Sequence, residues 1–144
     1  MEVDILNIIY DSQQYLDSVA LRNEVFRKPH GLDIKDDDLS EDESMDMYGA
    51  YIEGKLIGTV FLKENDSVCV QIKAVGILDE FRGIGLGRYL LEFIENLARK
   101  RGYSQAKLMA RVSCKDFYIK LGYEAISEPY NYKTIPHLDM TKSL

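Results

Sequence analysis

The clearest helical pattern of apolar positions begins at Leu86 and runs for about four turns. The apolar residues recur at helical spacing, at Leu86, Leu90, Phe93, Ile94 and Leu97. Basic residues at 99–101 suit the negative end of a helix dipole, and Gly102 is a typical C-terminal cap. We therefore predict a helix that begins in the glycine-rich turn at 83–87 and ends at about Arg101.

Residues 47–78 have the pattern of three successive strands. The triplets "EGK" (53–55) and "END" (64–66) are turn signals, so the three strands are predicted to form an antiparallel meander. Gly76 lies inside the third strand, where a glycine predicts a bulge or a close backbone approach.

Strand and helix patterns alternate along the rest of the chain. Strands are predicted at 3–10 and 104–112, with two more within 123–140. A capping box formed by Asp11 and Gln14 would open a helix that ends near Phe26, and a short helix at 114–121 would be capped by Gly122. This order predicts one α+β domain over residues 1–144, with a mixed sheet flanked by helices.

Composition and charge exclude several classes of protein. A chain of 144 residues that is 46% hydrophobic fits a single soluble domain, and no apolar run is long enough to span a membrane. The acidic N-terminus is unlike a signal peptide, and two cysteines do not make a disulfide framework, so we expect a cytoplasmic protein with reduced thiols. A net charge of −6 argues against a broad nucleic-acid interface.

Much of the negative charge is concentrated in one segment after the first helix. Its acidic residues are Asp33, Asp36, Asp37, Asp38, Glu41, Asp42 and Glu43, against a single Lys35. The simpler interpretation is a solvated loop, and the alternative is a rim that attracts cationic amines. A calcium loop is excluded because its sixth position, counted from Asp36, would be Glu41 rather than glycine. We expect no metal.

Three glycines at alternate positions, Gly83, Gly85 and Gly87, precede the main helix. Backbone N–H groups at a helix start have no internal partner, and glycines let a phosphate approach them closely, so an anion site is predicted. The alternative is tight packing of the helix on the sheet, which would usually need only one glycine. The sequence lacks the Gly-Lys-Ser/Thr of a P-loop, and its G-x-G-x-G spacing differs from the dinucleotide fingerprint.

Two motifs resemble those of the GNAT superfamily of N-acetyltransferases. "RGIGLG" at 82–87 is similar to the family's Arg/Gln-x-x-Gly-x-Gly/Ala signature, and "FYIKLGY" at 117–123 is similar to its "FYxKxGF" segment. The predicted order of elements agrees with the GNAT fold over nearly the whole chain. The resemblance implies a mostly antiparallel GNAT sheet and transfer of an acetyl group from acetyl-CoA to a primary amine.

The resemblance also implies where acetyl-CoA binds. Its pyrophosphate would lie on the loop formed by Arg82, Gly83, Ile84, Gly85, Leu86, Gly87 and Arg88. Val75 and Ile77 would give main-chain hydrogen bonds to the pantetheine arm, and the N–H of Val75 would polarise the acetyl carbonyl. Arg111 replaces an asparagine that contacts the cofactor in many members, so it either reaches a phosphate or faces solvent.

Tyr118 occupies the position of the family's general acid, although its spacing with Cys114 and Leu121 would also suit a core residue. "IPHLDM" resembles the C-terminal "IPHxxM" of one GNAT branch, which makes His137 a candidate base. The same branch shares "LRNEVF" (21–26), whose helix would bring Glu24 near the acceptor as a second candidate. Both residues also have ordinary structural interpretations, as a hydrogen-bonding histidine and a helix-surface glutamate.

The acceptor would be a small-molecule or peptide amine, and the acidic segment suggests a cationic one. A binding module is the alternative to an enzyme, namely an inactive domain that holds acetyl-CoA as a sensor or regulatory subunit. The intact glycine loop and the presence of Tyr118 favour the enzyme. Cys114 is expected to be a small buried residue rather than a nucleophile. Pairing of C-terminal strands into a homodimer is left open.

Overall fold

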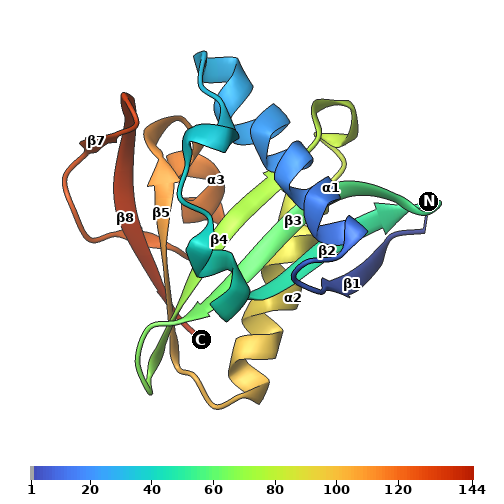
Figure 1. Ribbon diagram of the computed structural model, residues 1–144. Coiled ribbons are helices and arrows are strands. Elements are labelled where there is room, and N and C mark those ends of the chain that lie inside the picture. The colour runs from blue at the N-terminus through green and yellow to red at the C-terminus, as the bar shows by residue number, and fades with distance from the viewer. Residues whose placement is uncertain (1) are drawn as a thin grey trace.

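The computed structural model describes residues 2–144 and has one eight-stranded sheet at its centre (Figure 1). The strands lie in the order β1-β2-β3-β4-β5-β8-β6, and β7 also pairs with β8. Only the contact between β4 and β5 is parallel, which confirms a mixed, mostly antiparallel sheet. The strands are β1 Asp4–Ile8, β2 Asp46–Ile52, β3 Lys55–Glu64, β4 Cys69–Ile77, β5 Gln105–Arg111, β6 Glu124–Ala125, β7 Tyr130–Tyr132 and β8 Ile135–Ser143.

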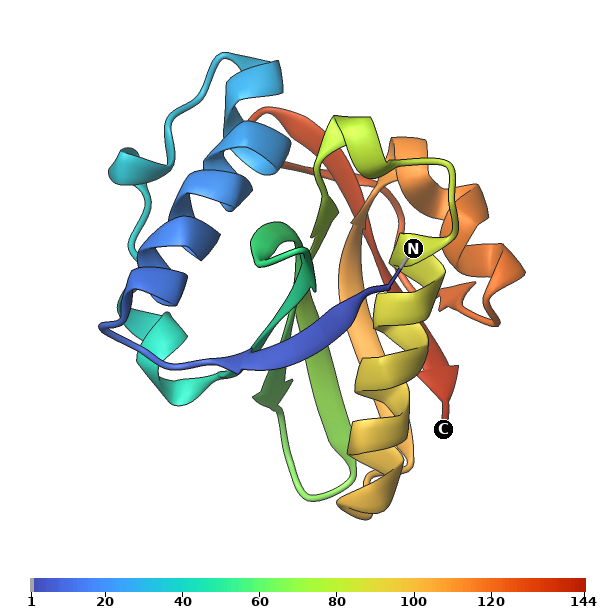
Figure 2. The same ribbon diagram turned by 90° about the vertical axis from the view of Figure 1, so that its right-hand side faces the viewer.

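Helices cover both faces of the sheet. In Figure 2, α1 lies on one side, while α2 and α3 lie on the other. The helices are α1 Gln13–Arg22, which continues into a π-helical turn at Asn23–Arg27, α2 Leu86–Lys100 and α3 Lys115–Lys120. Short 3-10 turns occur at Lys28–His30, Ile34–Asp36, Ser40–Ser44, Asp79–Phe81 and Val112–Cys114. None of the helices within residues 2–144 has the length and apolar character needed to cross a membrane.

The helix α2 packs on the sheet through the face that its periodicity predicts. Leu90 and Ile94 are fully buried, whereas Phe93 and Leu97 are only partly buried at the edge of the core. Gly102 ends the helix as predicted, with a φ of 91° and its N–H bonded to the Arg99 carbonyl.

Two local predictions need correction. The N-cap of α1 is Ser12, whose Oγ accepts a hydrogen bond from the Tyr15 N–H, and not Asp11, which has a φ of 61° in the preceding turn. The short side chain of Asp11 allows this left-handed turn, so the residue ends the strand connection instead of capping the helix. Three strands, β6, β7 and β8, begin within residues 123–140, where two were predicted. The extra strand, β6, is too short to leave a pattern in the sequence, because it pairs with β8 over only two residues.

A bulge interrupts β4 beside Gly76. Thr59 of β3 pairs with Gly76 and Phe61 pairs with Lys73, so Ala74 and Val75 together oppose a single residue. A Cβ at Gly76 would lie 2.6 Å from Cζ of Phe26. The predicted bulge is therefore present, formed by the two residues before Gly76, whereas the close neighbour of Gly76 is a side chain and not backbone.

Beyond this region β4 and β5 diverge. Their parallel pairing covers only Cys69–Gln71 against Gln105–Lys107, at the beginning of each strand. The later residues of both strands have no partner across the gap, while their other edges remain paired with β3 and β8. The sheet thus opens into a wedge between its two halves.

A buried ion pair fixes the acidic segment to α1. Nη2 of Arg22 lies 2.7 Å from Oδ2 of Asp42, and the two side chains are only 7% and 5% exposed. Tyr15 donates a hydrogen bond to the same carboxylate oxygen, and the Arg22 guanidinium lies 4.9 Å from the centre of the Phe61 ring. Burial, together with the hydrogen bond to Asp42, raises the pKa of Tyr15 to about 12.

We expect Asp42→Ala to lower the free energy of unfolding by about 3–5 kcal/mol, because it leaves the Arg22 guanidinium buried without its carboxylate. Urea denaturation at pH 7 measures the change. Asp36→Ala, which removes an exposed acid from the same segment, is the matched control and should change stability by less than about 0.5 kcal/mol. Equal effects of the two variants would show that the ion pair does not anchor the segment.

Candidate functional site

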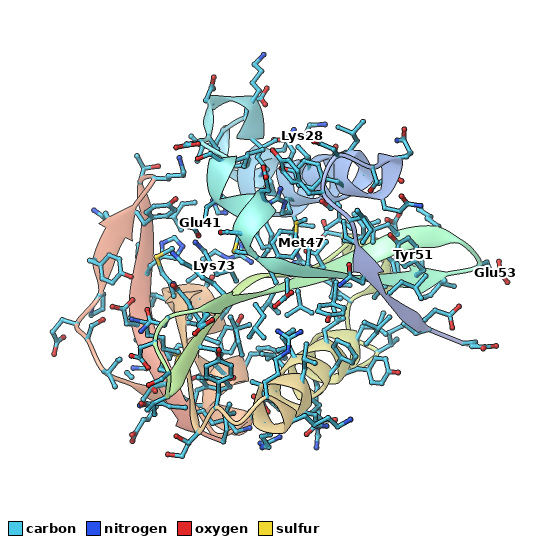
Figure 3. The ribbon with its side chains drawn as sticks, turned by 60° about the horizontal axis from the view of Figure 1, so that its bottom comes forward. Lys28, Glu41, Met47, Tyr51, Glu53 and Lys73 are labelled. Atoms are coloured by element: carbon cyan, nitrogen blue, oxygen red, sulfur yellow. The ribbon has the colours of Figure 1, made fainter. Side chains whose placement is uncertain are left out.

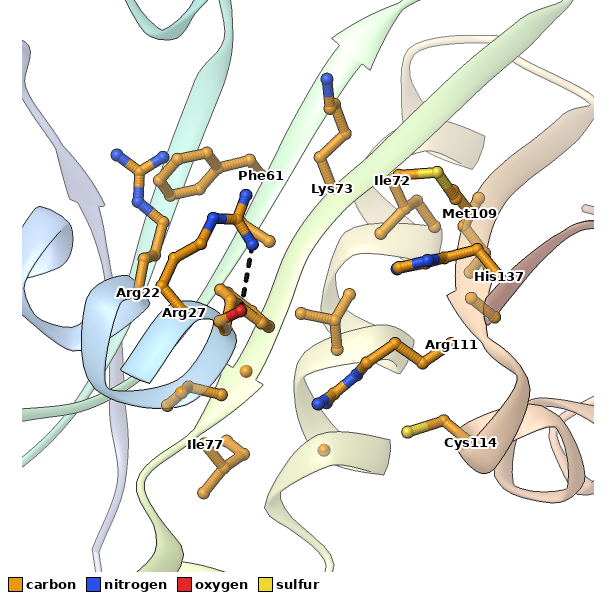
Figure 4. A pocket seen from close by; sticks show the side chains of 18 of the residues that line it. Arg22, Arg27, Phe61, Ile72, Lys73, Ile77, Met109, Arg111, Cys114 and His137 are labelled. Atoms are coloured by element: carbon orange, nitrogen blue, oxygen red, sulfur yellow. Dashed lines mark hydrogen bonds between the residues drawn. The ribbon is translucent and has the colours of Figure 1, made fainter. Parts of the chain in front are cut away.

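The wedge between β4 and β5 opens into a cavity of about 870 Å³. Its walls come from β4, the end of β5, the first turn of α2, α3, the acidic segment and β8 (Figure 4). The cavity therefore collects segments from most of the chain.

At one end of this cavity lies the glycine loop that precedes α2. Gly83 and Gly85 have φ angles of 82° and 85°, and a Cβ at either position would meet no atom within 4 Å. Of the three, only Gly87 has a close neighbour, since its Cβ would lie 3.2 Å from Cζ of the Phe117 ring. Two of the three glycines thus serve the shape and accessibility of the backbone, which favours the anion site over the packing alternative.

The loop presents backbone N–H groups at the start of α2. Gly85 is the N-cap and supplies no side-chain cap to these groups. All of the predicted loop residues line the cavity except Ile84, which is 54% exposed. Arg82 and Arg88 are more than half exposed and pair with Asp79 and Glu92, so both guanidinium groups can turn toward an anion at small cost.

The unpaired edge of β4 forms one wall of the wedge. Val75 and Ile77 both line the cavity, and Val75 is part of the bulge. A strand edge without a neighbour offers main-chain donors and acceptors to an extended ligand, as an added strand would use them. This wall can therefore hold a linear, amide-containing arm.

Tyr118 lies both in the hydrophobic core and at the wall of the cavity. Its side chain on α3 is 8% exposed and belongs to the hydrophobic core, and it also lines the cavity. Within residues 2–144 its hydroxyl has no hydrogen-bond partner. Burial raises the pKa of Tyr118 above its ordinary value of 10.0, with a smaller opposing effect from Arg111. The phenol is a proton donor at neutral pH.

His137 points into the cavity from β8 (Figure 4). Its Nδ1 lies 2.7 Å from the Ile135 carbonyl, which can only accept, so Nδ1 carries the proton. This tautomer leaves the Nε2 lone pair of the neutral ring free. The Tyr132 ring packs edge-on against the imidazole and helps to hold its orientation.

Arg111 and Cys114 also point into the cavity (Figure 4). Arg111 lies directly opposite His137 in the pairing of β5 with β8, and its guanidinium has no acidic partner within the described residues 2–144. Cys114, the N-cap of α3, is half-buried rather than buried as expected, because it packs against the core on one side and lines the cavity on the other.

The structure does not bring Glu24 to this site. Glu24 lies on the outer face of the turn after α1, where its carboxylate is 54% exposed and pairs with Lys28. It is not among the residues that line the cavity.

The acidic segment lines the cavity, but most of its lining carboxylates are already paired. Asp37 lies 2.7 Å from Arg27 and 3.4 Å from Lys133, and Glu41 binds both Lys63 and Lys73. Figure 3 labels Glu41 beside Lys73, and hydrogen bonds from Lys73 and Lys63 hold the pKa of the Glu41 carboxyl below its usual range. The segment is neither a freely solvated loop nor an uncompensated acidic rim.

Sequence reasoning missed this set of ion pairs. The basic partners come from α1, β3, β4 and the turn after β7, and no local pattern in the sequence joins them to the acidic segment. The available signal was the excess of acids itself, since a compact chain must either expose such charges or pair them. In residues 2–144, no three histidine, cysteine or acidic side chains come together as a metal site would require.

Comparisons with known proteins agree with this geometry. The family model described as "Acetyltransferase (GNAT) domain" matches residues 13–144. A Bacillus subtilis (strain 168) protein whose name places it among the acetyltransferases is 29% identical over 140 residues, which cover 93% of this chain and 92% of that protein.

Solved structures show the same fold. A Lactobacillus plantarum protein crystallised under an N-acetyltransferase name has a TM-score of 0.87 at 23% identity, covering 100% of this chain and 99% of its own. A GNAT acetyltransferase from Elizabethkingia anophelis, solved with acetyl-CoA bound, has a TM-score of 0.75 at 18% identity, with 99% and 98% of the two chains covered. The family match over most of the chain leads to one conclusion: this protein belongs to the GNAT family of acetyltransferases.

Proposed function

We propose that the protein transfers the acetyl group of acetyl-CoA to a primary amine by direct attack of the amine on the thioester. One observation carries the proposal. The uncapped start of α2 and the hydroxyl of the largely buried Tyr118 side chain open onto the same cavity, so an anion site and a proton donor would be available to one ligand. The acetyl-CoA bound to the E. anophelis neighbour, which shares the fold, supports this choice of acetyl donor.

The residues at the glycine loop fit the pyrophosphate of acetyl-CoA. The space above Gly83 and Gly85 is open, and the backbone N–H groups of the first turn of α2 face it. Arg82 and Arg88 would add charge-assisted hydrogen bonds. The unpaired edge of β4 at Val75 and Ile77 would hold the pantetheine arm, and the N–H of Val75 would polarise the acetyl carbonyl.

Tyr118 would act as the general acid. When the amine nitrogen bonds to the acetyl carbon and the carbon–sulfur bond breaks, the leaving thiolate needs a proton, and the phenol supplies it. Because burial keeps this phenol protonated, the donor is in the correct state throughout the neutral range.

His137 would act as the base. An amine arrives as an ammonium ion and must lose one proton before its lone pair can attack. Nε2 of His137 can accept that proton because Nδ1–H is held by the Ile135 carbonyl. The second proton of the attacking nitrogen restores Tyr118, so that one proton is released for each acetyl group transferred.

The acceptor would be a small-molecule or peptide amine whose ammonium group enters the cavity, part of which is lined by the acidic segment. We also propose a cytoplasmic setting, in which Cys69 and Cys114 stay reduced, as their free thiols suggest.

We expect Gly85→Asn to weaken acetyl-CoA binding about tenfold, or about 1.4 kcal/mol. Asparagine tolerates the left-handed backbone, so the fold should persist while its side chain occupies the space meant for the phosphates. Calorimetric titration measures the affinity. Gly54→Asn is the matched control, because Gly54 has a similar φ of 78° and equally open surroundings in the β2–β3 hairpin. Equal affinities in the two variants would remove the loop from the binding site.

We expect Tyr118→Phe to lower kcat by about 10²–10⁴-fold while acetyl-CoA still binds, since only the proton donor is lost. Steady-state kinetics and calorimetry separate the two effects. Tyr89→Phe, at an exposed tyrosine of α2, is the control. An unchanged kcat would exclude Tyr118 from proton transfer, and absence of turnover in the wild-type protein with every amine tested would favour the inactive acetyl-CoA-binding module.

The raised pKa of Tyr118 also makes a pH prediction. A general acid loses activity as pH rises through its pKa, and burial places this pKa above 10.0. We therefore expect kcat, measured with saturating substrates, to show no decrease between neutral pH and about pH 10. A decrease below that pH that is absent from Tyr118→Phe would contradict the proposed protonation state.

A further inference from the structure

We propose that the acceptor is a compact amino acid, in which a carboxylate close to the reacting amine binds the guanidinium of Arg111. This inference rests on the proposed function and names its acceptor class. Arg111 lines the cavity and has no acidic partner within residues 2–144.

The charges that line the cavity support a negative group on the ligand. Three pairs neutralise one another there, namely Arg22 with Asp42, Arg27 with Asp37 and Lys73 with Glu41. Arg82 and Arg88 pair with acids beside the glycine loop. Among residues 2–144, Arg111 is thus the one lysine or arginine of the cavity wall without an acidic partner.

The cavity offers little uncompensated negative charge in return. Asp38 is its one lining carboxylate without a basic partner within residues 2–144. It lies exposed on the acidic segment and accepts a hydrogen bond from the Ser40 N–H. Within the described residues, the cavity therefore has no buried, unpaired carboxylate that could bind a second positive charge on the acceptor.

Arg111 is also partly withdrawn from water. A guanidinium at a cavity wall loses hydration on one side, and a ligand that fills the cavity removes more of it. A carboxylate restores the interaction, because its two oxygens match two N–H groups of arginine in a bidentate pair. Neutral or cationic ligands would leave this charge unpaired.

The position of Arg111 places this interaction at the reacting end of the cavity. Arg111 and His137 are direct cross-strand partners on β5 and β8, so their Cβ atoms are about 5 Å apart. Arg111 and Tyr118 also line the same cavity. Arg111 is therefore next to the proposed base and opens onto the same space as the proposed acid. Both side chains enter the same cavity from adjacent strands, so one small molecule would reach both, with its amine at His137 and its carboxylate at Arg111.

A ligand of this kind differs from polyamines and from lysine side chains of proteins, in which no free carboxylate lies close to the reacting amine. The alternative partner for Arg111 is a phosphate of acetyl-CoA, which is also an anion. The two possibilities predict different losses when Arg111 is changed, because one affects the acceptor and the other affects the cofactor.

The first experiment measures binding without turnover. Calorimetry with the CoA-loaded protein would compare N-acetylglycine, N-acetylserine and N-acetylmethionine with the corresponding N-acetyl amino amides. We expect at least one acid to bind about tenfold or more tightly than its amide, and Arg111→Gln to abolish the preference. Arg111→Lys should retain part of it. Lys100→Gln, which removes one positive charge from the exposed far end of α2, should retain all of it.

The second experiment measures acetyl transfer to the free amino acids and to their amides. We expect kcat/KM to favour the acids by about tenfold or more, with this ratio falling toward one in Arg111→Gln through a rise in the acceptor KM. Calorimetry of Arg111→Gln with acetyl-CoA alone is the companion measurement.

The outcomes distinguish the two proposals. Equal treatment of acids and amides, no binding of any acid, or a loss in Arg111→Gln confined to acetyl-CoA affinity would overturn the amino-acid inference. Acetylation of amines without a carboxylate preference would leave the proposed function standing while overturning the inference. Carboxylate binding that depends on Arg111, with no acetyl transfer to any amine, would contradict the proposed function. It would still support a carboxylate site at Arg111.

Discussion

The divergence of β4 and β5 is the constraint on which the rest of the site depends. Backbone N–H and C=O groups need partners, and a sheet normally supplies them across each strand edge. Here the bulge at Ala74 and Val75 and the short parallel pairing leave two facing edges open within one continuous sheet. Because α2 follows β4 and α3 follows β5, the same divergence brings the glycine loop and Tyr118 to one cavity.

Features that depend on a few neighbouring residues could be predicted from the sequence. Contacts between residues far apart in the chain could not. The helix α2, its Gly102 cap, the meander and the irregularity beside Gly76 each follow from a few neighbouring residues. The convergence of Tyr118, His137 and the glycine loop was expected only through resemblance to a family. The partners of Asp42 and Glu41 lie 20 to 32 residues away in the chain, so no spacing rule identified them.

The ion pairs of the acidic segment change the meaning of the net charge of −6. Asp42, Asp37 and Glu41 form ion pairs with basic residues from different parts of the fold. These carboxylates therefore hold the segment in place and contribute little to the electrostatic potential of the surface. They hold the segment against α1 and the middle strands, where it lines the cavity. Among the lysines and arginines of the cavity wall within residues 2–144, Arg111 is left without an acidic partner.

The ion pair between Lys133 and Asp37 connects two distant parts of the chain beside the cavity. Asp37 follows α1, and Lys133 lies in the turn between β7 and β8, so the pair joins the two halves of the split sheet at a second point. Together with the strand pairing at the base of the wedge, it gives the two sides of the cavity a second connection. Asp37 itself lines the cavity, so this ion pair lies at the cavity margin. The attraction between Lys133 and Asp37 weakens as ionic strength rises, so this second connection depends on salt concentration.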